Sequence, residues 1–376
     1  MPRFSLLPVV ILLLAVCQVQ AYDVLCHNGD TGFHAEFRTG VIVSVGPPTQ
    51  AGLAAARVCR ATLSWNNQEV VVADRAEEVD LDLFGVDLGL GEPVAAFQLK
   101  NSAAECCQTY KIYSLRPPPR LLRTLTGGIY FSARDSNLDG RVEIWTDDAA
   151  AVNGLEGLRS SELQYPPACV LRFDGGQLLD VSSEFQPFFD DIVTKIRAEM
   201  NPAELAQFRL GKPAAPQLPA VKKQVLELVW SYLYSGREKQ AWQTLADMWP
   251  AADVKRIRSA LERARGRGLR SQVDGSLHTS FVEEQHAHVY DFPEELARPI
   301  VVRYYPPKGK KALNGKLRLT LIVDFAGKVW SVKVAGRNKA AGEYVKDSSA
   351  NWKFVPAFDG NNSVASRVHM TISLAQ

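Results

Sequence analysis

The sequence predicts a multidomain α+β protein. It has an antiparallel β-rich N-terminal region, a helical hairpin in the middle and a two-layer α+β domain at the C-terminus. Between residues 40 and 114, short segments alternate apolar and polar residues. From Phe188 onward apolar residues recur at every fourth position, which is typical of helices. The chain returns to alternation from Leu317. With 376 residues, it is long enough for two to four such domains.

Residues 1–21 have the pattern of a secretory signal peptide. Arg3 precedes an apolar run from Leu6 to Val16, and Val19-Gln-Ala21 supplies a small-residue cleavage site. The apolar run is shorter than the roughly 20 residues that a membrane-spanning helix needs. We therefore expect an exported protein, periplasmic or secreted. Lipidation of Cys17 is the alternative, and it is the one case in which we expect membrane contact.

Residues 22–115 predict an antiparallel all-β domain, either a sandwich or part of a propeller. The expected strands are separated by Gly, Pro and Asn turns and span residues 40–45, 57–64, 69–73, 94–99 and 109–114. The acidic run 77–82 is interpreted as solvated surface. His27 and His34 would be candidate catalytic bases only if the fold placed a carboxylate beside them in a cleft.

The cysteines fit an oxidising compartment. Removal of the signal peptide leaves five: Cys26, Cys59, Cys106, Cys107 and Cys169. An odd number allows two disulfides and one spare thiol. A bond from Cys26 to Cys59, and one from Cys106 or Cys107 to Cys169, would each link neighbouring β segments. Spacing alone leaves the pairing open.

A second β region, residues 116–186, contains a loop suited to calcium. Oxygen-bearing residues alternate along it, and Gly140 permits the sharp turn that such loops need. The loop resembles the calcium loop of FG-GAP repeats, and this resemblance implies a structural calcium ion. The implied ligands are four side chains and the main-chain carbonyl of Arg141, namely Asp135, Asn137, Asp139, Arg141 and Glu143. The alternative is an Asx-rich hairpin turn without metal.

Residues 187–270 predict helices, followed by a polar linker at residues 271–299. Apolar residues from Phe188 to Met200 lie on one face of the first helix. After a Pro-rich break at residues 213–219, three further helices with tight turns resemble a single tetratricopeptide-type unit. Three tryptophans are expected in the core of this region, namely Trp230, Trp242 and Trp249.

Residues 300–376 predict a β-hairpin, a helix and a closing strand. The two hairpin strands span residues 317–323 and 329–334 on either side of a turn at Ala326-Gly327. A helix within residues 340–352 would cover their apolar face, and residues 364–374 alternate again as a strand. The expected product is a helix packed on an antiparallel sheet.

This order resembles the TonB C-terminal domain family, above all in the run from Trp352 through Phe354 and Pro356 to Ala357. Domains of that family bind an extended peptide of an outer-membrane transporter, largely by pairing with a sheet edge. The resemblance therefore implies an envelope protein as partner, bound through an exposed edge. Because the last strand lies near the chain end, we expect partner binding at Val368, Met370 and Ile372.

An interaction or scaffold role is expected rather than energy transduction. A transducer needs a retained membrane anchor and a long Pro-rich spacer, and neither is evident in the sequence. The net charge of +2 and 46% hydrophobic residues describe ordinary globular modules and give no reason to expect nucleic acid as a partner. The C-terminal domain could also pack intramolecularly and simply hold the protein together.

Enzymatic activity is not expected. No Gly-rich phosphate loop, nucleophile elbow or paired-carboxylate motif stands out. The alternative is a hydrolase acting on an envelope polymer, or a carbohydrate-binding protein, with the N-terminal β region as its substrate-binding part.

Overall fold

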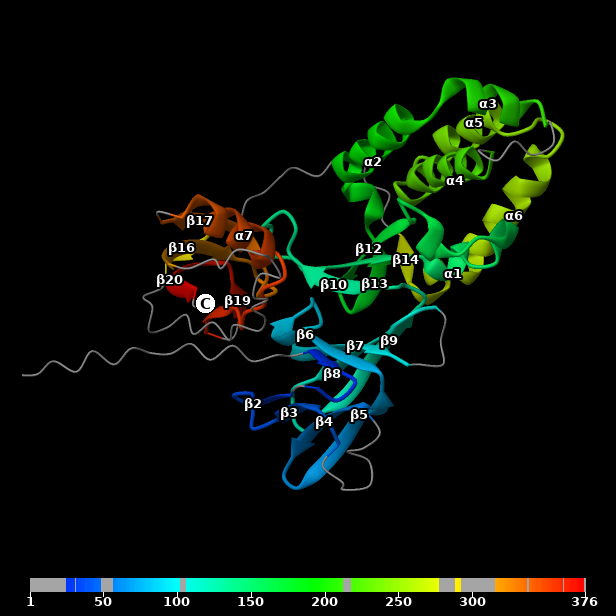
Figure 1. Ribbon diagram of the computed structural model, residues 1–376. Helices are drawn as coiled ribbons and strands as arrows, with labels where there is room; N and C mark the ends of the chain where they lie inside the picture. The colour runs from blue at the N-terminus through cyan, green and yellow to red at the C-terminus, as the bar shows by residue number, and fades with distance from the viewer. Residues whose placement is uncertain are drawn as a thin grey trace, which may run out of the picture.

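A computed structural model describes residues 25–30, 32–48, 57–101, 106–211, 218–276, 288–291, 315–336, 338–360 and 362–374. These residues form a mixed α+β structure with seven α-helices and several sheets, and the N-terminal part is mostly β (Figure 1). The α+β prediction is confirmed at this level. The signal peptide and most of the expected linker lie outside the described residues.

Two antiparallel sheets build the N-terminal part. The first has the order β2 (Phe33–Glu36), β3 (Ile42–Gly46), β4 (Cys59–Trp65) and β5 (Gln68–Ala76). The second has the order β1 (Leu25–His27), β6 (Glu78–Asp87), β7 (Pro93–Lys100), β8 (Thr109–Ser114) and β9 (Arg120–Thr126). Residues of both sheets share one buried hydrophobic cluster, which includes Val43, Leu63, Phe97 and Tyr113. The two sheets therefore face each other across this cluster.

The sheet that contains β6 to β8 is covered on its second face as well. Its residues Leu83, Ala96 and Ile112 belong to the largest hydrophobic cluster, together with residues of the next sheet and of the helices. That next sheet has the order β10 (Phe131–Arg134), β11 (Glu143–Asp147), β12 (Ala168–Asp174), β13 (Gln177–Asp180) and β14 (Gly275–Ser276). Because β9 pairs with β8, the second sheet extends past residue 115.

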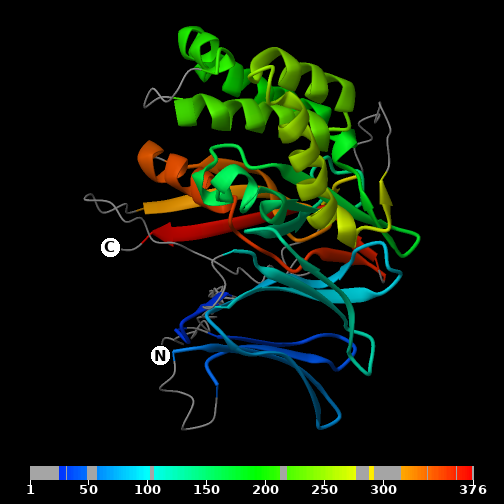
Figure 2. The ribbon, with the colours of Figure 1, turned by 90° about the vertical axis from the view of Figure 1, so that its right-hand side faces the viewer.

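Helices occupy the end opposite to the sheet β2–β5 (Figures 1 and 2). They are α1 (Ala149–Val152), α2 (Gln186–Glu199), α3 (Pro202–Arg209), α4 (Leu218–Tyr234), α5 (Glu238–Met248) and α6 (Val254–Arg267). The expected helices are present, and α3 is an additional one whose N-terminus is capped by the Asn201 side chain. Trp230 and Trp249 are buried, and Trp242 is partly buried against the same cluster.

The chain ends in a small α+β unit, here called the C-terminal module (residues 315–374). Its strands β20 (Ser366–Leu374), β16 (Gly315–Val323) and β17 (Val329–Ala335) form a sheet in this order, and the short strand β15 (Tyr290–Asp291), from before the module, pairs with β20. Helix α7 (Lys339–Ser349) covers one face around Leu319, Leu321 and Val345, and a hairpin of β18 (Ala357–Asp359) and β19 (Asn362–Val364) precedes β20. The module lies beside the middle of the stacked layers (Figures 1 and 2).

The cysteine pairing differs in part from expectation. Cys26 and Cys59 form a disulfide, which is one of the pairings considered from the sequence. The expected bond from Cys106 or Cys107 to Cys169 is wrong, because Cys106 and Cys107 are bonded to each other. Cys169 is a free thiol enclosed in the largest hydrophobic cluster, where burial raises its pKa well above the ordinary value.

Candidate functional site at the base of the C-terminal module

The β16–β17 turn, residues 324–328, has a rigid local structure. Asp324 Oδ1 accepts hydrogen bonds from the main-chain N–H groups of Ala326 (2.9 Å) and Lys328 (2.8 Å). Gly327 has a φ of +78°, and its carbonyl accepts a hydrogen bond from Phe354 N at 2.7 Å. The turn and the run around Phe354, both singled out in the sequence, are therefore one structural unit.

This turn inserts into the body of the protein. Ala326 belongs to the largest hydrophobic cluster, and Phe325 packs against it. Lys328 Nζ lies 2.5 Å from Asp82 Oδ1 and donates a second hydrogen bond to the Asp82 carbonyl at 2.9 Å. Both residues are buried, with 8% and 4% exposure. An ion pair with so little water around it depends on complete hydrogen bonding.

Asp82 has its remaining acceptor sites filled from two sheets. Asp82 Oδ2 accepts from the Tyr110 hydroxyl at 2.7 Å and from Ala133 N at 2.8 Å. Burial alone would raise the pKa of Asp82, but the positive charges of Lys328 and Lys353 and the hydrogen bonds outweigh it and hold this pKa below the ordinary value. The carboxylate is thus kept charged in the interior.

Lys353 makes a second link of the same kind. Its Nζ donates to Asp80 Oδ2 at 2.7 Å and to the Leu81 carbonyl at 3.2 Å. The interpretation of residues 77–82 as solvated surface is therefore wrong for Asp80 and Asp82, which bind Lys353 and Lys328 of the C-terminal module. The alternation of acidic and apolar residues from Glu78 to Leu83 could have revealed the strand β6.

The loop predicted to bind calcium lies next to this junction. Asp135 and Glu143 are fully buried. Asp135 accepts from the main-chain N–H groups of Asp139 (3.1 Å) and Gly140 (2.9 Å). Asn137 Oδ1 accepts from Asp139 N at 3.3 Å. The loop therefore folds back on its first carboxylate, as the expected sharp turn requires.

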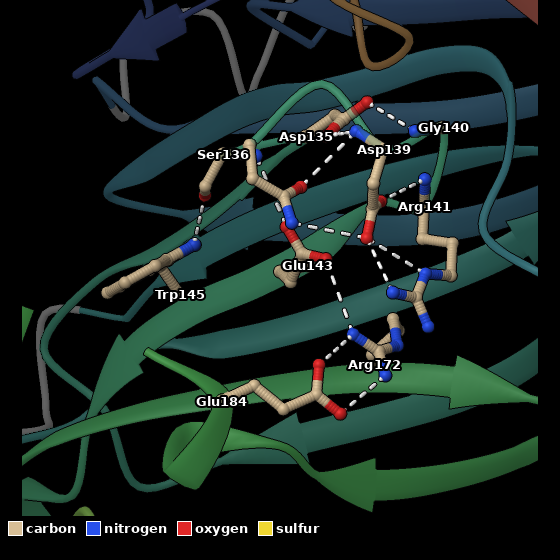
Figure 3. A network of polar contacts seen from close by, with 10 residues as sticks. Asp135, Ser136, Asp139, Gly140, Arg141, Glu143, Trp145, Arg172 and Glu184 are labelled. Carbon is tan, nitrogen blue, oxygen red and sulfur yellow. Dashed lines mark hydrogen bonds and ion pairs between the residues drawn. The ribbon is translucent and has the colours of Figure 1, made fainter. Parts of the chain in front are cut away.

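The other predicted ligands are engaged by arginines (Figure 3). The Arg141 guanidinium binds Asp139 Oδ2 at 2.6 Å. Glu143 Oε2 accepts from Ser136 N at 3.2 Å, whereas Glu143 Oε1 is buried without a hydrogen bond and lies 3.6 Å from Arg172. Arg172 is itself held by Glu184 through two hydrogen bonds of 2.6 and 2.8 Å.

Burial of these carboxyl groups has an electrostatic cost. It raises the pKa of Asp135 to about 6 and that of Glu143 to about 8. A bound cation would stabilise the charged form of these carboxylates, and carboxylate oxygens are the ligands that calcium prefers. In the described residues, however, no three His, Cys, Asp or Glu side chains are arranged as a metal-binding group. Asp139 Oδ2, on one of the predicted ligands, accepts two hydrogen bonds from the Arg141 guanidinium.

The calcium-type loop and the C-terminal module touch directly. Asp135 N donates to Asp324 Oδ2 at 3.0 Å, and a Cβ at Gly140 would lie 3.4 Å from the Phe325 ring. Burial raises the pKa of Asp324 to about 7. No feature of the sequence assigned Asp324, Lys328 or Lys353 to this junction.

The predicted partner-binding residues lie on β20, and their side chains face the module's own core. Val368 is buried, and Met370 and Ile372 are half-buried against the cluster under α7. β20 pairs with β16 along its length, but with β15 only at Ser366 and Arg367. Among the described residues, the outer edge of β20 beyond Arg367 and the outer edge of β17 have no partner strand.

His27 and His34, the two candidate bases, each lie beside a polar side chain. His27 Nδ1 lies 3.2 Å from Glu78 Oε1, and His34 Nδ1 lies 2.8 Å from Ser44 Oγ. His34 and Ser44 line a surface hollow of about 530 Å³ on the sheet β2–β5. Glu69 also lines it, but is paired with Arg60 at 2.5 Å.

No family model matches the chain, and neither a curated protein nor a solved structure matches it. Of the helices in the described ranges, none is both long and apolar enough to span a membrane. Function is therefore inferred from the residues and contacts described above.

Proposed function

We propose that this protein is an exported cell-envelope protein whose TonB-C-like C-terminal module binds a partner protein. The partner, an envelope protein, adds an extended segment to an open strand edge of the module, and neither nucleic acid nor catalysis is involved. The main support for this proposal is that the module is attached to the body at one end and has an open strand edge elsewhere in the same sheet. Lys328 and Lys353 fix the module to the body, whereas no strand of the described residues pairs with the outer edge of β20 beyond Arg367. Unpaired edges are the usual sites of strand addition.

A scaffold role agrees better with this attachment than energy transduction does. The module's contacts with the body include a buried ion pair and the packing of Phe325 and Ala326 into the main cluster. These contacts also support the alternative that the module holds the protein together. The two roles are compatible, because the contacts use the turn, and described residues leave unoccupied the outer edge of β17 and that of β20 beyond Arg367.

We further propose that calcium stabilises the loop at residues 135–143 and has only a structural role. Glu143 supports this, because its buried carboxyl group feels the charges of Asp135 and Asp139, and its Oε1 atom makes no hydrogen bond and lies 3.6 Å from Arg172. Asp135, Asn137, Asp139, Glu143 and the Arg141 carbonyl would hold the ion. Calcium would supply positive charge that relieves the burial of the carboxylates.

Site-specific cross-linking tests strand addition in the full chain. A photo-reactive amino acid replaces exposed Thr371 on β20, exposed Ala335 on β17 or, as a control, Leu121 on β9, which is 49% exposed. A single envelope protein cross-linked from the β20 position, and not from Leu121, supports edge recognition. Equal yields from all three positions, or cross-links only within the chain, contradict it.

The carbohydrate-binding alternative rests on the hollow beside His34 and Ser44. Binding of purified envelope glycan to the intact protein would favour it over protein binding, provided that His34→Ala abolishes the binding and the replacements at Thr371 and Ala335 retain it. Hydrolysis of that glycan would favour the alternative that the protein is a hydrolase of an envelope polymer.

A further inference from the structure

One face of the C-terminal module's sheet is strongly basic. Helix α7 covers the opposite face, where Leu317, Leu319 and Leu321 are buried. Side chains alternate along a strand, so the residues between these leucines lie on the uncovered face. On β16 these include Lys316 and Arg318, both exposed.

The neighbouring strands add to the same face. The register pairs Thr320 with His369 on β20 and with Lys333 on β17. Thr320 Oγ1 lies 3.2 Å from His369 Nδ1, so these side chains meet on one side of the sheet. Arg318, Lys333 and His369 line a shallow hollow of about 350 Å³ that runs across the three strands.

No negative charge balances this face within its three main strands. The sequences of β16, β17 and β20 contain no Asp or Glu. Among the described residues, Lys316, Arg318 and Lys333 make no ion pair. The whole chain has 43 basic and 41 acidic residues, so the one-sided charge belongs to this surface and not to the overall composition.

The molecule itself contains one example of how an acidic strand meets this face. β15 lies on the outer edge of β20, with Asp291 opposite Arg367. Their side chains form an ion pair of 2.5 Å between Asp291 Oδ1 and the Arg367 guanidinium. An acidic residue on a strand that pairs with this edge can thus form an ion pair with the basic residue of β20 opposite it.

We propose that the basic face selects an acidic partner segment. The segment adds to β20 beyond Arg367 and has Asp or Glu at alternate positions, on the side of His369 and Arg318. Its other side chains point toward the α7 side and are uncharged. This inference rests on the proposed strand addition and specifies the chemistry of the partner.

Four synthetic nine-residue peptides test the inference on the full-length mature protein. The first alternates Val with Glu, and the second and third carry Thr or Lys in place of Glu. The fourth has the composition of the first with its glutamates clustered at one end. Binding is measured by fluorescence anisotropy at low and at physiological salt, because charge contacts weaken with ionic strength.

The Val-Glu peptide is expected to bind about tenfold more tightly than the Val-Thr peptide, and the Val-Lys peptide more weakly than both. The double variant Arg318→Gln/Lys333→Gln should lose that tenfold preference, while its affinity for the Val-Thr peptide stays the same. Lys339→Gln/Lys346→Gln on α7 is the matched control, because these exposed lysines lie on the covered side. The control should bind all peptides like the wild type.

Other results would overturn the inference in distinguishable ways. Equal binding of the Val-Glu and Val-Thr peptides would remove the acidic preference and leave strand addition intact. Equal binding of the alternating and clustered Glu peptides would show charge attraction without strand pairing. Failure of all four peptides to bind, combined with no cross-linking from Thr371, would remove both the inference and the proposed function.

Discussion

Lys328 and Asp82 form a buried ion pair of 2.5 Å although 246 residues separate them in the sequence. Tyr110 of β8 and Ala133 of β10 bind the other oxygen of the same carboxylate. Two sheets of the body and the C-terminal module therefore meet at one side chain. Such a group fixes the module in one position, because any displacement leaves a charge unpaired in the interior.

Changing Lys328 to Met should lower the free energy of unfolding by about 3–5 kcal/mol, since Asp82 would remain buried without its cation. Urea denaturation of the full chain measures this. Lys333→Met, which changes an exposed lysine of the same sheet, is the control and should shift stability by less than about 0.5 kcal/mol.

Adding Asp82→Asn to Lys328→Met should recover a large part of the loss, because both charges of the pair are then removed. The double-mutant cycle gives the coupling between the two residues. Simple additivity of the two single changes would mean that the ion pair does not hold the module in place.

Strands were predictable from sequence where alternation was clear, as in β16 and β17, whose expected bounds agree closely with the observed ones. Their pairing as a hairpin was also predicted, but the contacts of the turn between them with the body were not. Residues 77–82 alternate like a strand, yet their charges favoured an interpretation as surface, and only the fold brings Lys328 and Lys353 to them. Local spacing identified the 135–143 loop but could not identify Arg172 or Asp324, which come from distant segments.

Gly327 should tolerate no side chain. Its φ of +78° disfavours any L-residue, and a Cβ there would lie 1.9 Å from the Phe354 carbonyl oxygen. Gly327→Ala should cost about 3 kcal/mol or more, as judged from urea midpoints. Gly176→Ala is the matched control, since Gly176 has a φ of +82° and no atom near its would-be Cβ. It should cost only about 1–2 kcal/mol. Equal losses would mean that contact with Phe354 is unimportant.

The disulfide between Cys26 and Cys59 should contribute about 4 kcal/mol, given its sequence separation of 33 residues. The double variant Cys26→Ala/Cys59→Ala should therefore unfold at a clearly lower urea concentration than the wild type. Labelling of the buried Cys169 thiol gives an independent readout, because it requires unfolding. Faster labelling in the double variant is expected. Unchanged labelling and an unchanged midpoint would contradict the assigned role.

Asp147 should make stability depend on pH. Burial raises its pKa to about 6, and its Oδ2 has no hydrogen bond. The folded state therefore binds this proton more tightly than the unfolded state, in which the pKa is near 4. The free energy of unfolding is highest below pH 4 and falls as the pH rises toward 6. Asp147→Asn should reduce this loss by about 2 kcal/mol. Asp247→Asn, at an exposed helical site, should leave the profile unchanged. Melting temperatures of the wild type and the two variants are measured from pH 4 to 7. The same pH dependence in all three proteins would refute the effect.

Calcium should raise the melting temperature of the protein at pH 7.5, and EDTA should reverse the increase. Binding to the native loop adds stability that grows with the ratio of free calcium to its dissociation constant. Glu143→Gln should remove most of this gain, because it replaces the carboxylate of a fully buried proposed ligand by a neutral amide. Glu238→Gln, which alters a largely exposed glutamate on α5, should keep it. Identical melting curves with calcium and with EDTA would instead identify residues 135–143 as a turn held by backbone N–H groups and Arg141, as in Figure 3.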